Sequence, residues 1–354
     1  MMFSCVPRII SWNTTFRCNL KCSHCYVDAN KENSFNELNT EQGKVLIDQI
    51  SELSKPILVL SGGEPLLRDD IFELANYGTK KGLIVTMGTN GTLITDDVAK
   101  QLVHSGVRTV AVSVDSDSPK FHDQFRGVKG AWQKTMEGIK ACLRNGLNVQ
   151  FNITVAQQNF ENLENIFSMA ESYGVKNAHL FFLVSTGRGK NIKDVTPEIY
   201  EGVLNYVFQW NSVHQLNVKP TCAPQFMRIA KQMNIKNQRY SRGCIAGISY
   251  CRITPDGSVT PCPYLPVSVG NVKDAAFNYI WYGSEILKAL RNYEHHLNGK
   301  CGKCEYRIIC GGCRARAAGL YDNTLTVKQQ SNKFNTLKQS LFAEDPWCNY
   351  NPKR

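Results

Sequence analysis

Fourteen cysteines constrain what this chain of 354 residues can fold into more than any other feature of its sequence. Three of them, Cys18, Cys22 and Cys25, lie close together near the N-terminus, and eight more lie between Cys244 and Cys348. The first residues lack a charged stretch followed by an apolar one, so no secretory signal is visible and we expect a cytoplasmic protein. In a reducing compartment this many thiols favour metal binding over a disulfide framework.

The composition favours an ordinary globular protein, because 42% of the residues are hydrophobic and 20% are charged. The longest apolar runs, such as Leu180–Val184, are far shorter than the ~20 residues of a membrane span, so we expect no membrane association. A formal charge of +11 is compatible with nucleic acid or with an anionic small molecule as partner. The basic residues are scattered and thiolate ligands would lower the charge, so we do not expect a nucleic-acid partner.

The first half of the chain alternates short apolar runs with longer amphipathic segments, which predicts strands and helices in turn. Strands are expected at Ile9–Ser11, Ile57–Leu60, Leu83–Met87, Thr109–Val114, Val149–Val155 and Ala178–Val184. Helices are expected at Glu41–Ser54, Ile71–Lys81, Asp96–Ser105, Ala131–Asn145 and Asn162–Tyr173, several of them followed by a glycine. Such α/β units imply parallel strands with right-handed crossovers, in a partial α/β barrel or in a doubly wound sheet.

After about residue 190 the alternation fades. Pro197–Trp210 predicts a helix, and from Cys244 onwards turns such as Pro255–Gly257 replace the regular apolar periodicity. Loop-rich regions of this kind are usually stabilised by metals rather than by a core. We therefore divide the chain into a core at residues 1–190, a helical linker at 191–240 and a cysteine-rich domain at 241–354.

The three N-terminal cysteines follow directly on the first predicted strand, where parallel α/β barrels place their chemistry. Three thiolates on one short loop are able to hold three irons of a [4Fe-4S] cubane and to leave the fourth iron open. A closed zinc site needs a fourth ligand at comparable spacing, and His24 is adjacent to Cys25, which is poor geometry. The loop therefore predicts an iron–sulfur cluster with an open iron.

This loop resembles that of the radical S-adenosylmethionine (SAM) superfamily, and two further segments carry the same resemblance. Gly62-Gly63-Glu64-Pro65 follows the second predicted strand, and Gly88-Thr89-Asn90-Gly91 follows the third. The resemblance implies a partial (β/α)6 barrel of the TIM type in which the open iron binds SAM. Reductive cleavage of SAM then gives methionine and a 5′-deoxyadenosyl radical, which takes a hydrogen atom from an unactivated carbon.

The resemblance also implies which residues contact SAM. The turn at Gly62, Gly63, Glu64 and Pro65 is expected at the amino group of its methionine, since glycines allow close backbone approach and a glutamate accepts from an ammonium. The remaining expected contacts are Thr89 and Asn90 in the next loop, Ser113, Asp115 and Asn152 at the ribose, Arg126 at the carboxylate, and His24 and Tyr26 at the adenine.

The eight cysteines nearer the C-terminus resemble the SPASM extension of radical SAM enzymes, which carries auxiliary [4Fe-4S] clusters. The spacing departs from that pattern at one point, because two residues rather than three separate Cys310 from Cys313. By this resemblance we expect one or two auxiliary clusters, the first held by Cys244, Cys251, Cys262 and Cys313, and the second by Cys301, Cys304, Cys310 and Cys348. Two structural zinc ions are the alternative.

Three cysteines remain outside these sets. Cys142 lies on a predicted helix and fits a buried apolar position, and Cys5 is expected to be incidental. Cys222 lies between Pro220 and Pro224, just ahead of the extension. For this thiol we expect a catalytic role, as donor of a hydrogen atom or a proton or as ligand to a substrate metal.

Further segments resemble the haem-biosynthesis branch of radical SAM/SPASM enzymes, and the match covers nearly the whole chain: Ser11–Thr15, Phe181–Gly189, Pro220–Arg228, Arg242–Pro263 and Asp345–Cys348. One type in this branch removes acetates from 12,18-didecarboxysiroheme to give iron-coproporphyrin III. A second removes propionates on the way to haem d1, and a third oxidatively decarboxylates propionates to vinyl groups. The resemblance is greatest to the acetate-removing type, which is the function we expect.

An iron-containing tetrapyrrole with many carboxylates is therefore the expected substrate, and a small ferredoxin- or flavodoxin-type protein the expected electron donor. Arginines bind carboxylates bidentately. The candidates are Arg188, Arg228, Arg242, Arg314 and Arg316, with His295 and His296 as candidate ligands to the substrate iron.

Two other classes of function remain open. Some SPASM enzymes modify peptides, but these often carry an additional N-terminal domain, and only about ten residues precede the first predicted strand here. The non-enzymatic alternative is an iron–sulfur electron carrier or a zinc-stabilised binding module. Neither of these needs an open iron beside a Gly-Gly-Glu-Pro turn.

Overall fold

The computed structural model describes residues 5–27, 29, 36–235, 242–321 and 334–352. A single ten-stranded sheet runs through it, in the order β10-β9-β8-β1-β2-β3-β4-β5-β6-β7. The strands are β1 (Ile9–Asn13), β2 (Ile57–Ser61), β3 (Ile84–Thr89), β4 (Thr109–Ser113), β5 (Asn148–Val155), β6 (Asn177–Phe182), β7 (Asn217–Thr221), β8 (Tyr250–Ile253), β9 (Ser258–Thr260) and β10 (Gly270–Asn271). All pairings from β8 through β1 to β7 are parallel, whereas β8–β9 and β9–β10 are antiparallel.

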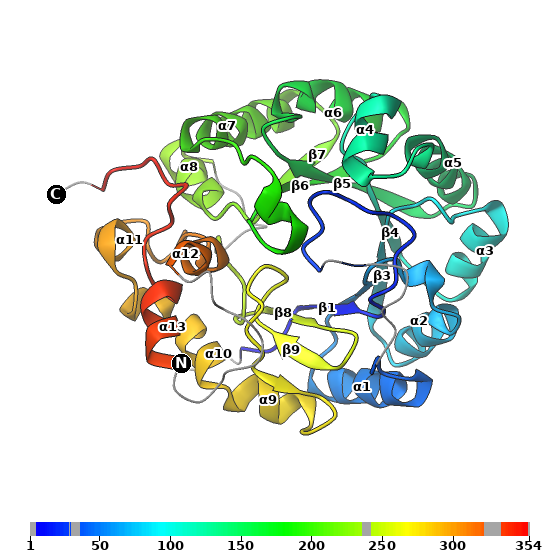
Figure 1. Ribbon diagram of the computed structural model, residues 1–354, viewed down its shortest axis with the longest axis horizontal. Helices are drawn as coiled ribbons and strands as arrows, with labels where there is room; N and C mark the ends of the chain where they lie inside the picture. The colour runs from blue at the N-terminus through cyan, green and yellow to red at the C-terminus, as the bar shows by residue number, and fades with distance from the viewer. Residues whose placement is uncertain (1–4, 28, 30–35, 236–241, 322–333, 353–354) are drawn as a thin grey trace.

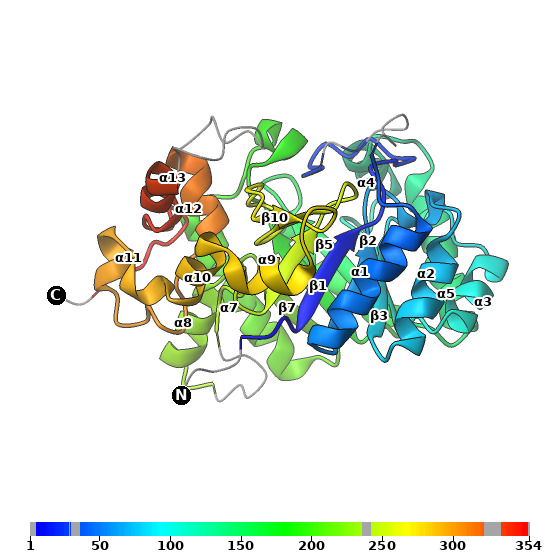
Figure 2. The ribbon, with the colours of Figure 1, turned by 90° about the horizontal axis from the view of Figure 1, so that it is seen from below.

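Helices cover the outside of this curved sheet, and the loop that follows β1 lies inside the curve (Figure 1). Figure 2 shows the later helices α10 to α13 grouped at one side, away from α2, α3 and α5. The α-helices are α1 (Thr40–Leu53), α2 (Ile71–Lys80), α3 (Asp96–His104), α4 (Pro119–Arg126), α5 (Ala131–Arg144), α6 (Leu163–Ser172), α7 (Pro197–Val213), α8 (Gln225–Gln232), α9 (Phe277–Gly283), α10 (Glu285–Arg291), α11 (Gly299–Lys303), α12 (Arg314–Tyr321) and α13 (Phe334–Leu341). Short 3-10 helices are η1 (Pro65–Leu67), η2 (Phe160–Asn162), η3 (Gly187–Asn191) and η4 (Tyr293–His295). In the described part of the chain, no helix has both the length and the apolar character of a membrane span.

Side chains along each strand alternate between the helices and the inside of the curve. Trp12 is fully buried against α1, where a Cβ on Gly43 would lie 2.7 Å from the Trp12 ring. Its neighbours Ser11 and Asn13 therefore face inward. The same alternation turns buried aliphatic side chains of β2 to β7 toward the helices and leaves half-buried, mostly polar side chains inside.

The expected partial barrel is confirmed, and it extends further along the chain than expected. All six expected strands form, but β7 lies within residues 191–240, so this segment belongs to the barrel and is not a linker. Pro220 and Lys219 hide β7 from a pattern search. The structure tolerates the proline because β7 is the edge of the sheet, where a missing N–H breaks no ladder.

Strand β8 is the second extension. It comes from the expected cysteine-rich domain, yet it pairs in parallel with β1, with Ile10 opposite Cys251 and Ser11 opposite Arg252. The C-terminal region therefore shares one sheet with the core instead of forming a separate unit.

Candidate active site

The chain that leads to Cys18 is joined by backbone hydrogen bonds to the turn after β2. The Thr14 N–H donates to the Ser61 carbonyl at 2.7 Å. Gly63 and Glu64 then donate to the carbonyls of Thr15 and Arg17, each at 2.8 Å. These three bonds fix the direction in which the chain enters the cysteine loop.

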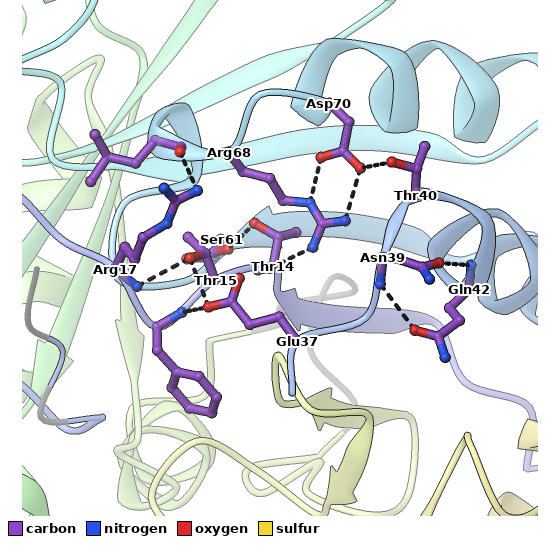
Figure 3. A network of polar contacts seen from close by, with 12 residues as sticks. Thr14, Thr15, Arg17, Glu37, Asn39, Thr40, Gln42, Ser61, Arg68 and Asp70 are labelled. Atoms are coloured by element: carbon purple, nitrogen blue, oxygen red, sulfur yellow. Dashed lines mark hydrogen bonds and ion pairs between the residues drawn. The ribbon is translucent and has the colours of Figure 1, made fainter. Parts of the chain in front are cut away.

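Side chains brace the same segment (Figure 3). Arg68 is buried, donates from Nη1 to the Thr14 carbonyl at 2.8 Å and forms an ion pair with Asp70 at 2.5 Å. The Thr15 hydroxyl donates to Glu37 Oε1 at 2.9 Å, and Arg17 Nη2 donates to the Leu67 carbonyl at 2.6 Å. These side-chain hydrogen bonds tie the loop entrance to the segment after β2 and to Glu37.

The two glycines of the turn are required by this close packing. Gly62 has φ of 152°, and a Cβ there would lie 2.7 Å from the Thr15 carbonyl oxygen. A Cβ on Gly63 would lie 2.2 Å from the carbonyl oxygen of Arg17. Backbone packing against the cysteine loop, and not only the approach of a ligand, therefore demands glycine at both positions.

The structure brings the three N-terminal cysteines together in a small cluster with Leu20 and Ala29. Burial, together with the charges of Glu64, Cys22 and Cys25, raises the pKa of the Cys18 thiol to about 12. The Leu20 N–H donates to Cys18 Sγ at 3.4 Å. Three adjacent thiols on one loop with backbone donors match the donor set that a [4Fe-4S] cluster requires.

A second segment clamps this loop from the end of β6. The N–H of Arg188 donates to the Cys25 carbonyl at 2.9 Å, and its Nε donates to the Cys22 carbonyl at 2.8 Å. Gly187 has φ of 53°, and a Cβ there would lie 2.4 Å from the Cys25 carbonyl oxygen. Arg188, expected to bind substrate carboxylates, instead holds the backbone of the cysteine loop.

Glu64 lies in the turn after β2 and contacts the turn after β3. It is fully buried, and its carboxylate accepts from the Thr89 hydroxyl and the Asn90 N–H at 2.8 Å each and from the Leu66 N–H at 3.2 Å. Burial raises its pKa to about 7, although these three donors oppose the change. Glu64 therefore ties the loops after β2 and β3 together through Thr89 and Asn90. Pro65 begins η1 and is buried beside it.

Arg126 and Asp115 lie on the other side of the cysteine loop and form a buried ion pair. Arg126 Nη1 also lies 3.7 Å from Cys22 Sγ. Burial lowers the pKa of His24 to about 3, with a further contribution from Arg126, so this imidazole is neutral. Its ring stacks on Phe125 at 4.3 Å between centroids.

Several polar atoms around the loop are buried without a hydrogen-bond partner among the described residues. They include Nδ1 of His24, Nε of Arg126 and Oδ1 of Asn13. Asn13 donates through Nδ2 to the Tyr26 hydroxyl at 3.2 Å. Buried polar groups are rarely left unsatisfied, so these atoms fit a polar ligand such as SAM beside the three cysteines.

The expected ribose contacts lie on neighbouring strands at one level of the barrel. Ser113 of β4 is opposite Asn152 of β5, and Asn152 is opposite His179 of β6. Asn152 Oδ1 accepts from Gln150 at 2.8 Å. Ser113 and Asn152 are half-buried inward positions, whereas the Asp115 carboxylate is committed to Arg126 and to the N–H of Thr154.

Among the C-terminal cysteines, the structure brings together a group that differs at one position from the first expected ligand set. The sulfur of Cys222 interacts electrostatically with those of Cys313, Cys262 and Cys244, and burial together with these charges raises its pKa. We name these four residues the inner quartet. Cys251 is fully buried in the apolar core, and its partner in β1 is Ile10, which faces the helices. Strand alternation thus turns the Cys251 side chain away from the other cysteines.

The structure brings the four cysteines of the second expected set to one pocket, and we name them the outer quartet. Cys301, Cys304, Cys310 and Cys348 line one open pocket together with Arg228, Lys300 and Arg307. Burial raises the pKa of Cys348 to about 11. No three His, Cys, Asp or Glu side chains in the described part of the chain surround a single-ion position. In a cubane each thiolate binds a different iron, so the sulfurs are spaced more widely than around one ion.

The other candidate arginines make contacts within the protein. Arg228 pairs with Glu201 at 2.5 Å, and Arg242 lies 3.9 Å from Glu294. Arg314 donates to carbonyls near α13, and Arg316 donates to the carbonyls of Leu183 and Cys222 at 3.2 Å each. The two candidate histidines lie at η4 in the C-terminal region, where the ring of His296 packs against Phe342. Sequence reasoning overlooked an inward arginine, Arg252 of β8, whose only signal was its place in a short strand.

An open parallel barrel with a three-cysteine loop at the end of β1 and two cysteine quartets defines a radical SAM enzyme with an iron–sulfur extension. Comparison with known proteins agrees: residues 12–170 match the Radical SAM superfamily and residues 244–305 match an iron-sulfur cluster-binding domain of the SPASM type. The chain belongs to the haem-biosynthesis branch of the radical SAM/SPASM family. It is 38% identical to an AdoMet-dependent heme synthase of Methanosarcina barkeri, over 98% of this chain and 97% of that protein.

Two further relatives belong to the same branch. A Fe-coproporphyrin III synthase of Methanosarcina barkeri is 31% identical, over 96% of this chain and 87% of the relative. A pre-heme d1 synthase of Dinoroseobacter shibae is 30% identical, over 96% of this chain and 85% of that protein. The crystal structure of Streptococcus suis SuiB bound to S-adenosylmethionine superposes with a TM-score of 0.74 at 17% identity, covering 98% of this chain and 78% of that one. At this identity the superposition supports the fold alone.

Proposed function

We propose that this protein oxidatively decarboxylates propionate side chains of Fe-coproporphyrin III to vinyl groups and so forms haem. The observation that carries the proposal is the 38% identity to a haem synthase along almost the full length of both chains. Identity to the Fe-coproporphyrin III synthase is lower, at 31%. A radical SAM enzyme that acts on a tetrapyrrole is also what the sequence led us to expect. The relatives favour propionate, rather than acetate, as the side chain on which the enzyme acts.

The barrel residues would prepare the site for this chemistry. The three N-terminal cysteines would hold a [4Fe-4S] cluster that, together with bound SAM, supplies a radical able to take a hydrogen atom from an unactivated carbon. We propose that Ser113 and Asn152 bind the ribose, that the Gly62–Gly63 backbone meets the methionine, and that His24 and Tyr26 lie at the adenine. Arg126 is the candidate for the carboxylate of SAM, through its unpartnered Nε.

The two quartets would each hold an auxiliary [4Fe-4S] cluster with four thiolate ligands. Cys222 then serves as a ligand in the inner quartet rather than as a hydrogen donor, which replaces the catalytic role expected from its sequence context. With four ligands each, neither cluster leaves an iron open to substrate. Their contribution would be to accept or pass electrons and to stabilise the fold of the C-terminal region.

A small electron-donor protein of the ferredoxin or flavodoxin type is the partner we propose for the reducing electron. The outer quartet supports this proposal because it lines an open pocket, and the pocket also contains Lys300 and Arg307. Basic side chains around a redox site complement the acidic surface that such a donor would present.

The test is an anaerobic reaction of the reconstituted protein with SAM and a strong reductant, followed by mass spectrometry. Fe-coproporphyrin III and 12,18-didecarboxysiroheme are offered in separate reactions. Vinyl products with 5′-deoxyadenosine from the first support the proposal. Loss of acetates from the second would instead assign the protein to the acetate-removing type. If neither tetrapyrrole changes while 5′-deoxyadenosine forms, the radical core stands and a peptide substrate becomes the leading alternative.

A further inference from the structure

The inside of the barrel has an uneven distribution of charge. Inward positions on strands β1 to β8 carry hydroxyl, amide, aromatic and apolar side chains, and the only charged residues among them are Lys219 of β7 and Arg252 of β8. None of these inward positions on the eight strands carries a carboxylate. The interior is therefore suited to an anionic ligand.

Arg252 lies between the two cysteine loops. Its inward direction follows from the register, since it is opposite Ser11, and Ser11 faces away from the helices. The guanidinium lies 5.8 Å from the centre of the Tyr26 ring, directly after Cys25. Tyr26 in turn lies 5.4 Å from the Tyr264 ring, two residues after Cys262. Arg252 thus lies at the junction of the SAM-binding loop and the inner quartet.

Two short contacts orient the guanidinium. Nε donates to the Thr260 hydroxyl and Nη1 donates to the Pro263 carbonyl, each at 3.2 Å. No hydrogen bond from Nη2 to any described residue is present, and no carboxylate forms an ion pair with Arg252 in this part of the chain. The side chain is 5% exposed, so water screens the charge only weakly. Its charge also acts on the neighbouring Cys262 thiol, but no carboxylate pairs with it, and a buried, oriented guanidinium of this kind is a strong carboxylate-binding group.

We propose that Arg252 binds a carboxylate of the tetrapyrrole substrate, with Tyr26 and Tyr264 against the apolar part of that side chain. The proposal rests on the proposed function, because it takes the multiply carboxylated porphyrin as the ligand. It places a carboxylate between the SAM site and the inner quartet. Arg228 and Arg242, two of the five arginines suggested by the sequence, already face glutamates, whereas Arg252 has no carboxylate partner among the described residues.

The experiment measures binding rather than turnover. Fe-coproporphyrin III is titrated into the reconstituted full-length protein without reductant, and the absorbance change gives a Kd. Arg252→Gln is expected to weaken this binding about tenfold to a hundredfold, as for loss of a charge-assisted hydrogen bond. Arg252→Lys keeps the charge but loses the two parallel donors of the guanidinium. Its Kd for Fe-coproporphyrin III should lie between those of Arg252→Gln and the wild type. Iron content and the Kd for SAM should stay within about twofold of the wild type.

Thr260→Val is the matched control. It removes the hydroxyl that orients Arg252 and leaves the guanidinium in place, so we expect less than about threefold weaker porphyrin binding. An equal loss in Thr260→Val and Arg252→Gln would show that Arg252 acts only by shaping its loop, and would overturn the proposal. Weakened SAM binding with unchanged porphyrin binding would assign the carboxylate to SAM and also overturn it. If the wild type does not bind Fe-coproporphyrin III, the proposed function itself fails, and this result is visible before any variant is compared.

Discussion

Arg126 and Asp115 form an ion pair in which the arginine side chain is 7% exposed and the aspartate is fully buried. The same arginine lies 3.7 Å from Cys22 Sγ. Asp115 keeps this cation in place. Burial opposes the charged form of Asp115, but the charge of Arg126 holds its pKa below the usual value. Either charge alone would be unfavourable at this buried position. The inner quartet has a similar arrangement, since buried Arg316 lies near Asp345 and donates to the Cys222 carbonyl.

The pair makes a stability prediction. Arg126→Met leaves the Asp115 carboxylate buried without its cation and should lower the free energy of unfolding by about 3–5 kcal/mol. The double variant Arg126→Gln with Asp115→Asn removes both charges. Its free energy of unfolding should fall clearly less than that of Arg126→Met. Denaturant unfolding of the anaerobic protein measures both values. Equal losses in the two variants would mean that an unpaired, buried Asp115 carboxylate costs no stability, against this prediction.

The cysteine assignment makes a prediction about bound iron. Cys222→Ala should lower the iron content by about one auxiliary cluster and leave the SAM-binding cluster intact, because Cys222 lies with Cys244, Cys262 and Cys313. Cys251→Ala is the matched control, a buried cysteine seven residues after Cys244 that faces the core. Cys251→Ala should keep the full iron content. Because it removes only a buried sulfur, it should lower the free energy of unfolding by only about 1 kcal/mol. Iron analysis and Mössbauer spectra report both; the reverse pattern would restore Cys251 to the ligand set.

The sequence predicted the regular part of the barrel well, because strands β1 to β6 and their helices carry strong apolar periodicity and glycine stops. Gly82 and Gly106 illustrate this, with φ of 81° at the ends of α2 and α3. The eight-residue α4 was not predicted, although Ser118 caps it and Pro119 begins it. Its first turn has few apolar residues, so a periodicity search does not find it.

The errors at the site have a different physical origin. The resemblance to the SPASM extension suggested that Cys251 joins Cys244, but the direction of a side chain depends on strand register, which only the pairing of β8 with β1 reveals. The same register places Arg252 inside the barrel. Glu64 shows a further limit, since its motif does not reveal the three internal donors from which its carboxylate accepts.

The glycine turn offers a local prediction. In Gly63→Ala the new Cβ would lie 2.2 Å from the Arg17 carbonyl oxygen, so the backbone before Cys18 must shift. We expect loss of the SAM-binding cluster and of SAM cleavage, with auxiliary iron retained. Gly202→Ala in α7 is the control, because nothing lies within 4 Å of its added Cβ, and it should raise stability by about 0.5–1 kcal/mol. Normal SAM cleavage in Gly63→Ala would show that the contact is unimportant for the loop.

His179 inside the barrel predicts how stability depends on pH. Burial, and then the charge of Lys219, lowers the pKa of His179 to about 3, whereas an unfolded histidine titrates near 6.5. Below pH 6.5 the unfolded chain binds a proton that the folded protein excludes, so acid favours unfolding. The contribution of His179 to the free energy of unfolding is therefore complete above pH 6.5. It decreases as the pH falls toward 3, by at most about 1.4 kcal/mol per pH unit.

His179→Gln should flatten this dependence, because glutamine fills a similar position and does not titrate. The free energy of unfolding is measured between pH 4 and pH 7 for the wild type, for His179→Gln and for His104→Gln, an exposed residue at the end of α3. His104→Gln should follow the wild-type slope. If His179→Gln follows it as well, the folded protein accommodates the protonated imidazole, and the interior of the barrel must be wetter around β6 and β7 than the half-buried side chains there indicate.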